Sequence, residues 1–371
     1  MDGSQPGRIR DTITDFLKGC EDSASVREIE SVVTRRLGAV PASSIRSYLG
    51  LNTPKMFERT ERGHYRLTQS NAKNKIQTRK SLSNFEVTQI GTSKLYLGDC
   101  LEWLKAVEPR SFHAVVTDPP YGLVEYSEHE QTKLRKGKGG VWRIPPSFDG
   151  AKRAPLPRFT TLSATDIANM ASFFENLGLL LFRATVPGAN IVVASNPLLF
   201  HCVASSLAKG GLEPRGAITR LVMTMRGGDR PKNAHNEFKD ISVMPRSMWE
   251  PWLIFRRPLE GRTQDNLRKW GTGGFKRPSD ERPFGDVIKS HPTSKAERQI
   301  APHPSLKPQA FLREIVQAVL PLGKGTILDP FAGSGSTLAA AIACDYHCVG
   351  IEKDRTYFDM AADAIPMLSK L

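Results

Sequence analysis

The stretch that decides the fold is Ile-Leu-Asp-Pro-Phe-Ala-Gly-Ser-Gly-Ser-Thr, at residues 327–337. It begins in an apolar strand, passes through two glycines and opens a helical pattern that runs to Ala343. Glycines at such a junction let the backbone pass close to a ligand. Glu352 ends the next apolar strand, 19 residues after Gly333, where a carboxylate can accept hydrogen bonds from ribose hydroxyls. The stretch therefore predicts a site for an adenosine cofactor.

Two familiar phosphate-binding motifs do not describe this loop. It lacks the third glycine of GxGxxG, and no GK[ST] sequence follows it. A glycine turn that only packs a strand on a helix is the plainer alternative, and the strand context together with Glu352 disfavours it.

Strands and helices alternate on both sides of this stretch. Apolar strands are expected at 92–97, 114–117, 190–195, 217–225, 249–255, 326–328 and 348–351, and helices at 100–107, 166–185, 199–209 and 309–319. Such alternation predicts an α/β fold with a mainly parallel sheet covered by helices on both faces.

A second motif, Thr-Asp-Pro-Pro-Tyr-Gly at residues 117–122, directly follows one of these strands. Ligand sites of α/β folds form at the carboxyl ends of parallel strands. The prolines stiffen the turn, so a carboxylate, a backbone carbonyl and an aromatic ring share one small pocket. The two oxygens can accept the hydrogens of an exocyclic amine, and stacking on the ring contributes roughly 1–3 kcal/mol per base. The motif predicts a pocket for the amino group of a nucleobase.

Together the two motifs resemble those of the S-adenosylmethionine-dependent DNA amino-methyltransferases, in which DPPY holds the target amine and FxGxG holds the methyl donor. DPPY precedes FAGSG here, with a basic stretch between, which resembles the permuted group called β. The segment His-Pro-Ser-Leu-Lys-Pro at 303–308 is similar to the HPTxKP element of that group, with Ser305 where threonine is commoner. The resemblance spans about residues 90–365 and implies a Rossmann-like methyltransferase fold.

The resemblance also implies roles for individual residues. The target-binding and catalytic residues would be Asp118, Pro119, Pro120 and Tyr121. Contacts to S-adenosyl-L-methionine would come from Asp99, Ser305, Lys307, Asp329, Phe331, Ala332, Gly333, Gly335 and Glu352, with Ser305 and Lys307 near the methionine end of the donor. Asp99 would lie on the adenine side, although a Gly-Asp at a strand end is equally often a helix cap.

The chemistry expected is methyl transfer to adenine N6. Asp118 at the first motif position resembles the adenine enzymes, whereas the cytosine-N4 enzymes more often carry serine there, so cytosine N4 stays the alternative. None of the five cysteines follows a proline as a nucleophile would, which argues against cytosine C5 chemistry. A winged-helix regulator with a vestigial catalytic domain is a third interpretation, which the intact motifs disfavour.

Charge indicates a nucleic-acid partner. The formal net charge is +14, and residues 124–300 carry +11 of it. Lysines and arginines that neutralise phosphates gain affinity through counterion release, so duplex DNA is the expected partner, with the target base extruded from the helix. The candidate DNA-contacting and target-recognition segments are 123–160 and 257–300. The candidate DNA-binding residues are Arg256, Arg257, Arg262, Arg268, Lys269, Lys276 and Arg277.

The first 68 residues are expected to form a separate domain. Helical spacing recurs in three segments, and residues 56–67 read as a hairpin around Arg62-Gly63. This pattern resembles winged helix-turn-helix modules, with protein docking as the alternative to DNA contact. Residues 69–88 have the polar, basic composition of a linker, and residues 89–371 form the methyltransferase domain.

Composition and cysteine spacing limit which other classes of protein the sequence could belong to. Hydrophobic residues make up 39% of the chain, no apolar run is long enough to cross a membrane, and scattered cysteines suit a reducing cytoplasm. Cys344, His347 and Cys348 lack metal spacing, so no metal is expected. The resemblance allows a homodimer and a cognate restriction endonuclease as partners. No feature of the sequence itself indicates either of them.

Overall fold

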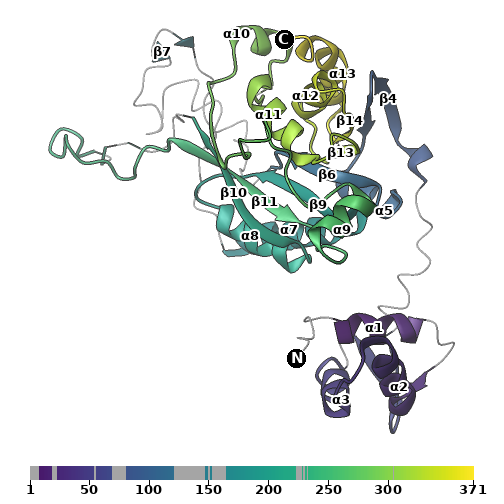
Figure 1. The fold of residues 1–371 in the computed structure, drawn as a ribbon. Coiled ribbons are helices and arrows are strands. Elements are labelled where there is room, and N and C mark those ends of the chain that lie inside the picture. The colour runs from purple at the N-terminus through teal and green to yellow at the C-terminus, as the bar shows by residue number, and fades with distance from the viewer. Residues whose placement is uncertain are drawn as a thin grey trace. The chain divides into compact units, whose positions relative to one another are not determined.

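The protein is described by a computed structural model of residues 8–18, 23–53, 56–68, 81–120, 147–148, 151–152, 164–222, 228, 230–231, 233–303 and 305–371. The chain divides into two compact units, residues 1–79 and residues 80–371 (Figure 1). Within the described residues, no helix is long and apolar enough to cross a membrane.

The first unit contains the helices and the hairpin expected from the sequence. Its elements are α1 (Arg8–Lys18), β1 (Ala24–Ser25), α2 (Val26–Leu37), α3 (Ala42–Leu51), β2 (Phe57–Glu61) and β3 (His64–Leu67). The Ser25 side chain accepts from the Glu28 N–H, and the Glu28 carboxylate accepts from the Ser25 N–H, so the predicted capping box starts α2. Ile13, Ile29 and Phe57 are fully buried in a small core that joins the helices to the hairpin.

The second unit is built on one large sheet. Nine strands of the described chain lie in the order β12-β10-β11-β9-β6-β13-β14-β5-β4. Their bounds are β4 (Glu86–Ile90), β5 (Ser93–Leu97), β6 (Phe112–Thr117), β9 (Thr185–Ala194), β10 (Glu213–Leu221), β11 (Trp249–Arg256), β12 (Val287–Lys289), β13 (Thr326–Asp329) and β14 (His347–Glu352). β11 and β4 run antiparallel to their neighbours, and the other strands share one direction. The sheet is therefore mixed, with a parallel centre.

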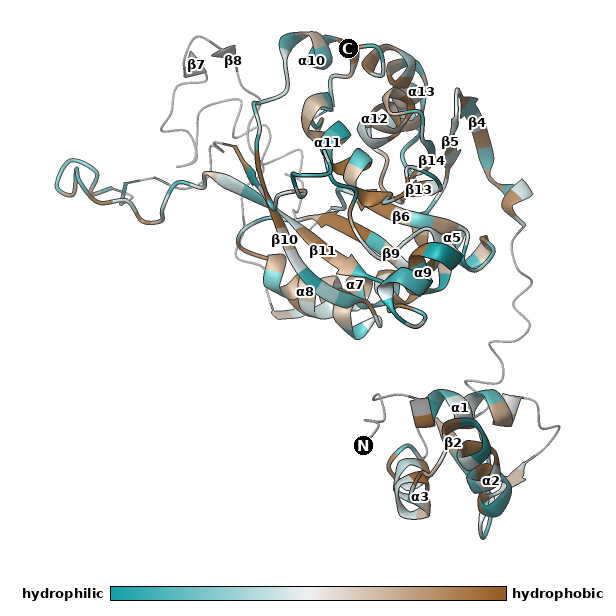
Figure 2. Ribbon diagram, in the orientation of Figure 1, coloured by the Kyte–Doolittle hydropathy of each residue, from teal (hydrophilic) through white to brown (hydrophobic). Residues whose placement is uncertain are grey.

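Helices cover both faces of this sheet (Figure 1). One face carries α5 (Cys100–Ala106), α7 (Ala164–Ala184) and α8 (Phe200–Lys209), and the other carries α11 (Gln309–Val319), α12 (Ser336–Ala343) and α13 (Arg355–Leu368). Each face has its own apolar core, and Figure 2 shows the hydrophobic strands between them. Burial of central strands on both faces explains their nearly continuous apolar sequences.

Several elements were not expected from the sequence. β4 lies where a linker was predicted, and η2 (Leu82–Asn84) precedes it. The segment 257–300 contains α9 (Thr263–Trp270), β12 and α10 (Lys295–Ile300). Each of these is short and mostly exposed, so few apolar residues mark it in the sequence. A two-stranded ribbon, β7 (Ser147–Phe148) with β8 (Ala151–Lys152), lies within the predicted loop 123–160.

The ends of the strands define two edges of the sheet. β5, β6, β9, β13 and β14 finish together at what we call the carboxyl edge and begin together at the amino edge. β13 and β6 are neighbours, yet the helix that follows β13 covers one face and α7, the first helix described after β6, covers the other. Such a reversal is where α/β sheets bind ligands.

Candidate active site

The two predicted motifs meet at this reversal. Asp118 follows β6 and Asp329 ends β13, and the two strands are parallel neighbours. The Thr117 hydroxyl donates a 2.7 Å hydrogen bond to Asp329 Oδ1, and that oxygen also accepts from the Phe331 N–H at 3.1 Å. One buried carboxyl group thus ties the end of β6, which leads into the predicted target motif, to the start of the glycine loop.

The environment of Asp329 perturbs its acidity. Burial raises the pKa of this carboxyl group to about 6, and the neighbouring Asp118 acts in the same direction. Hydrogen bonds from the Thr117 and Thr337 side chains and from the Phe331 N–H oppose the rise. An ionised carboxylate without a countercharge is costly in such a place.

Glu352 holds the glycine loop from the neighbouring strand. Its Oε2 accepts from the Gly333 N–H and its Oε1 accepts from the Asp354 N–H, each at 2.8 Å. The Ala332 N–H donates to the Ile351 carbonyl at 2.9 Å. The loop is therefore fixed against the end of β14, where the predicted ribose-binding carboxylate stands.

The two glycines have backbone conformations that other residues rarely adopt. Gly333 has φ +52° and Gly335 has φ +78°. A Cβ atom on Gly335 would lie 2.3 Å from Ile365 Cγ1 on α13, and one on Gly333 would lie 3.3 Å from the His303 ring. Both positions require bare backbone, which lets the loop turn sharply into α12.

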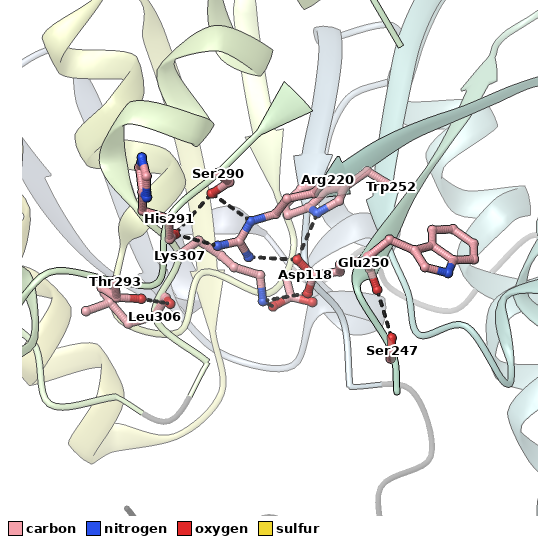
Figure 3. Close-up of polar contacts among 11 residues, drawn as sticks. Asp118, Arg220, Ser247, Glu250, Trp252, Ser290, His291, Thr293, Leu306 and Lys307 are labelled. Carbon is pink, nitrogen blue, oxygen red and sulfur yellow. Dashed lines mark hydrogen bonds and ion pairs between the residues drawn. The ribbon is translucent and has the colours of Figure 1, made fainter. Parts of the chain in front are cut away.

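Lys307 joins the target motif from a segment far along the chain (Figure 3). Its ammonium lies 2.5 Å from Asp118 Oδ2 and 3.3 Å from Glu250 Oε1. The side chains of Lys307, Asp118 and Glu250 are 11%, 16% and 16% exposed. Sequence resemblance implied that Lys307 lies near the donor, and the structure adds an ion pair with Asp118, the carboxylate that was predicted to bind the target.

Glu250 and Arg220 complete this cluster and were missed from the sequence. Arg220 donates to Glu250 Oε2 at 2.8 Å and to the Ser290 hydroxyl at 3.0 Å (Figure 3). The Trp252 indole N–H also donates to Glu250 Oε2, at 3.3 Å. Burial alone would raise the pKa of Glu250, but the positive charges of Lys307 and Arg220 hold it below its usual value.

A sequence signal for this pair existed. Arg220 and Glu250 each interrupt a segment that was predicted as an apolar strand. Charged residues are almost never buried unless they are paired, so two opposite charges inside two apolar strands indicate a partnership. The antiparallel register, which places Arg220 opposite Glu250, could not be derived from the sequence alone.

The comparison with known proteins rests on the region that holds this site. The sequence profile of the family N6_N4_Mtase, described as DNA methylase, matches residues 112–363, which is more than half of the chain. The chain belongs to this DNA methyltransferase family. The match includes Asp118, Lys307 and the glycine loop.

Individual relatives of the methyltransferase are distant. Type II methyltransferase M.ScaI of Streptomyces caespitosus is 37% identical over 285 residues, which cover 72% of this chain and 79% of that protein. Type II methyltransferase M.HindIII of Haemophilus influenzae is 22% identical over 298 residues, which cover 73% and 94%. A putative DNA modification methylase of Thermus thermophilus, solved with S-adenosyl-L-methionine, aligns with TM-score 0.47 and 19% identity over 74% of this chain and 93% of that one.

S-adenosyl-L-methionine is the cofactor of the methyltransferase. The residues at the glycine loop fit it. The loop exposes backbone where a side chain at Gly333 would meet His303, and the Glu352 carboxylate stands at the turn. Phe331 is partly exposed beside Phe173, with ring centroids 6.1 Å apart, and Ala332, also in the loop, is buried.

Asp99 has a structural role in the methyltransferase. Its Oδ1 accepts from the Leu101 and Glu102 N–H groups, so the side chain caps α5, and its Oδ2 pairs with Lys353 at 3.1 Å. This is the helix cap that the sequence left as the alternative to a cofactor contact. Asp99 still lies at the carboxyl edge, one strand beyond Glu352.

His303 lies next to the glycine loop, and Ser305 is hydrogen-bonded to His303. Ser305 is exposed, and its N–H donates to His303 Nδ1 at 3.1 Å. The His303 ring packs edge-on against Tyr357, with centroids 4.4 Å apart. Burial, together with the charge of Lys307, lowers the pKa of His303 to about 4, so the ring is neutral at physiological pH.

The predicted DNA-binding residues do not gather at Asp118. Arg256 ends β11 at the amino edge, opposite Asn190, and pairs with Glu213 at 2.7 Å. Arg257 donates to the Thr185 carbonyl, and burial lowers its pKa to about 10. Both guanidinium groups are therefore occupied within the protein.

Helix α9 and its N-cap residue Arg262 include three more of these predicted residues, and the helix also lies at the amino edge (Figure 1). Asn266 fastens it there by donating to the Pro187 carbonyl at 3.0 Å. Arg262 and Arg268 pair with Asp265, and Lys269 pairs with Glu260. Residues 257–276 of the basic segment, which was expected to contact DNA, thus lie along the opposite edge.

The last two predicted DNA-binding residues follow the same path. The Lys276 N–H donates to the Ala318 carbonyl near the end of α11, and Arg277 donates to the Glu281 carbonyl at 3.1 Å. The segment returns to the carboxyl edge only with β12, which brings Ser290 to Arg220. Tyr121 and nearly all of residues 123–160 lie outside the described residues.

Proposed function

We propose that the enzyme transfers the methyl group of S-adenosyl-L-methionine to N6 of adenine in duplex DNA, and that it belongs to the permuted group. The observation that carries the proposal is an aspartate, Asp118, at the start of the target motif, one strand from the glycine loop. A hydrogen-bond acceptor at this place can hold the target amine close to a methyl donor that is bound at the glycine loop.

The chain's own residues would act by holding the amine. The Asp118 carboxylate and the Pro119 carbonyl accept the two amine hydrogens, which directs the nitrogen lone pair out of the base. Tyr121 would stack on the extruded base. Bound S-adenosyl-L-methionine supplies an activated methyl group on a sulfonium. The geometry requires no covalent link between enzyme and base.

The target is tested with a tritiated donor. The full chain is incubated with DNA from a host that lacks DNA methylation, and the DNA is digested to nucleosides and separated. We expect label in N6-methyl-2′-deoxyadenosine. Label in N4-methyl-2′-deoxycytidine would replace adenine by cytosine, and DNA without label would favour a regulator whose catalytic domain is vestigial.

For the first unit we propose a winged-helix module that binds DNA. Its three helices and hairpin support the proposal. Three of its described arginines already have acidic partners, since Arg10 pairs with Asp11 at 2.8 Å, Arg46 with Glu30 at 2.7 Å and Arg66 with Glu58 at 3.0 Å. Tethering such a module would raise the local concentration of the catalytic unit on DNA.

The module is tested by truncation. The truncated chain should begin at Lys80, because the Phe85 ring packs against Gly98 and β4 begins at Glu86. We expect it to keep methyl transfer and to bind DNA more weakly than the full chain in a side-by-side titration. Equal DNA affinity would make the module a docking or dimerisation element instead.

A further inference from the structure

The β10–β11 ribbon carries two arginine–glutamate pairs in directly opposite positions. Arg220 faces Glu250 near the carboxyl edge, and Glu213 faces Arg256 at the amino edge. Both pairs form ion pairs, at 2.8 Å and 2.7 Å. Only the first is continued by further ionic contacts into a catalytic motif, through Lys307, among the residues that the structure describes.

Glu250 is built into its position. Its Oε2 accepts from the Arg220 guanidinium and from the Trp252 indole, which leaves Oε1 directed at the Lys307 ammonium. Arg220 is itself held by Ser290 and packs on the Phe311 ring, with 4.8 Å from its Cζ to the ring centroid. The side chain of Glu250 therefore cannot turn away without leaving buried donors unpaired.

The negative charge of Glu250 affects the reaction because it balances the charge of the cluster around Asp118. The formal charges of Arg220, Glu250, Lys307 and Asp118 cancel. Without the negative charge of Glu250, the Lys307 ammonium would lose one of its two carboxylate contacts and bind Asp118 more strongly, so it would compete with the target amine for that acceptor. The cluster would also carry a net positive charge beside the place where positive charge passes to the amine.

We propose that Glu250, held by Arg220, is a positioning residue for methyl transfer, because it shares the Lys307 ammonium with Asp118 and so keeps Asp118 available to the target amine. The inference rests on the proposed transfer to an amino group. It requires no particular base, since the exocyclic amines of adenine and cytosine both donate to a carboxylate.

The test is a double-mutant cycle between Glu250 and Lys307 in the full chain. The variants are Glu250→Gln, Lys307→Met and their combination, and the single-turnover rate is measured with saturating tritiated donor on unmethylated plasmid DNA. We expect Glu250→Gln alone to lower the rate about tenfold or more, and to lower it less than about twofold further once Lys307 is methionine. An equal factor in both backgrounds would overturn the inference.

Glu213→Gln is the matched control, because it removes the negative charge from the equivalent pair at the other end of the ribbon. Its rate should remain within about twofold of wild type in both backgrounds. Donor affinity, measured by calorimetry without DNA, should change less than about threefold in Glu250→Gln. A purely structural Glu250 would instead lower the thermal midpoint and reduce donor affinity and rate together, independently of Lys307.

Two outcomes separate this inference from the function on which it rests. If Glu250→Gln does not fold, Glu250→Asp replaces it, since aspartate keeps the charge and withdraws it from Lys307 by one methylene. The same loss of effect in the Lys307→Met background is expected. The nucleoside that carries the label tests the adenine assignment separately, and an inactive wild type would count against the proposed function.

Discussion

At one end of the β10–β11 ribbon an arginine and a glutamate are linked to the target motif, and at the other end the same two residue types only join two strands. Arg256 and Glu213 form an ion pair with each other. Nearby, the Arg257 guanidinium and a side-chain amide of α9 donate hydrogen bonds to backbone carbonyls. At the carboxyl edge Lys307 is shared between two carboxylates. The two arginine–glutamate pairs therefore differ in function because their neighbours differ. The net charge counted along the sequence cannot distinguish one pair from the other.

The largest effect should follow from removing the target-binding carboxylate. Asp118→Ala should lower turnover by roughly 10³-fold, the loss typical of a group that acts on the transition state. Donor affinity should stay within a few-fold, because Glu352 and the glycine loop remain. Arg256→Ala at the amino edge should be nearly silent in the same rate assay. Loss of donor affinity in Asp118→Ala would contradict the division of roles.

The second prediction concerns stability and pH at Asp329. Its pKa is about 6 in the folded chain, against an ordinary value of 3.8. The folded chain thus takes up a proton at higher pH than the unfolded chain, and folding gains stability as pH falls from about 6 to about 4. The shift corresponds to about 3 kcal/mol.

Asp329→Asn does not titrate and isolates this contribution. The free energy of unfolding of wild type, relative to the variant, should rise by up to about 3 kcal/mol between pH 7 and pH 4 in urea titrations. Arg256→Gln at the amino edge should show no such dependence. A difference that is constant with pH would mean that the folded protein keeps Asp329 ionised.

A smaller effect is expected for Glu352, whose carboxylate accepts a hydrogen bond from the backbone of the glycine loop. Glu352→Ala removes the acceptor of the Gly333 N–H, so donor binding should weaken about tenfold, or roughly 1.4 kcal/mol. Asp354→Ala is the matched control, because Asp354 caps α13 through the Thr356 and Tyr357 N–H groups. Calorimetric titration that found equal affinity in Glu352→Ala and wild type would exclude Glu352 from donor binding.

The smallest effect is expected from α9. Replacing Arg268 and Lys269 by alanine should leave the slope of log K against log[salt] for DNA unchanged, since both residues pair with acidic neighbours at the amino edge. Each phosphate contact contributes roughly 0.9 to that slope. A slope reduced by about two units would bring the duplex to the amino edge and remove the functional distinction between the two edges.

The sequence predicted correctly which candidate residues stand at the ends of parallel strands. Asp118, Asp329 and Glu352 each follow or end an apolar strand, and parallel strands bring such positions to one edge whatever their order in the chain. The alternating pattern also predicted α5, α7, α8, α11 and α12 within a few residues, but it did not predict α13. These features are local, so one sequence contains them.

The features that sequence reasoning missed depend on register and on paths between elements. The Arg220–Glu250 pair exists because an antiparallel register sets the two residues opposite each other. The basic segment 257–300 looked like one DNA-binding unit because its composition is uniform, yet α9 and β12 carry it from one edge to the other. β4 was hidden because only Ile90 among its residues is buried.

The ion pair between Lys307 and Asp118 has a consequence for the order of folding. It joins residues 189 positions apart, and the Thr117–Asp329 hydrogen bond spans 212 positions, whereas Arg220 and Glu250 are 30 apart. Closing longer loops costs more chain entropy and slows contact formation. We expect the β10–β11 ribbon to form early with its internal charge pair, and the methyl-transfer site to assemble among the last tertiary contacts. A folding intermediate would then contain Glu250 in place while Asp118 and Lys307 are still separate.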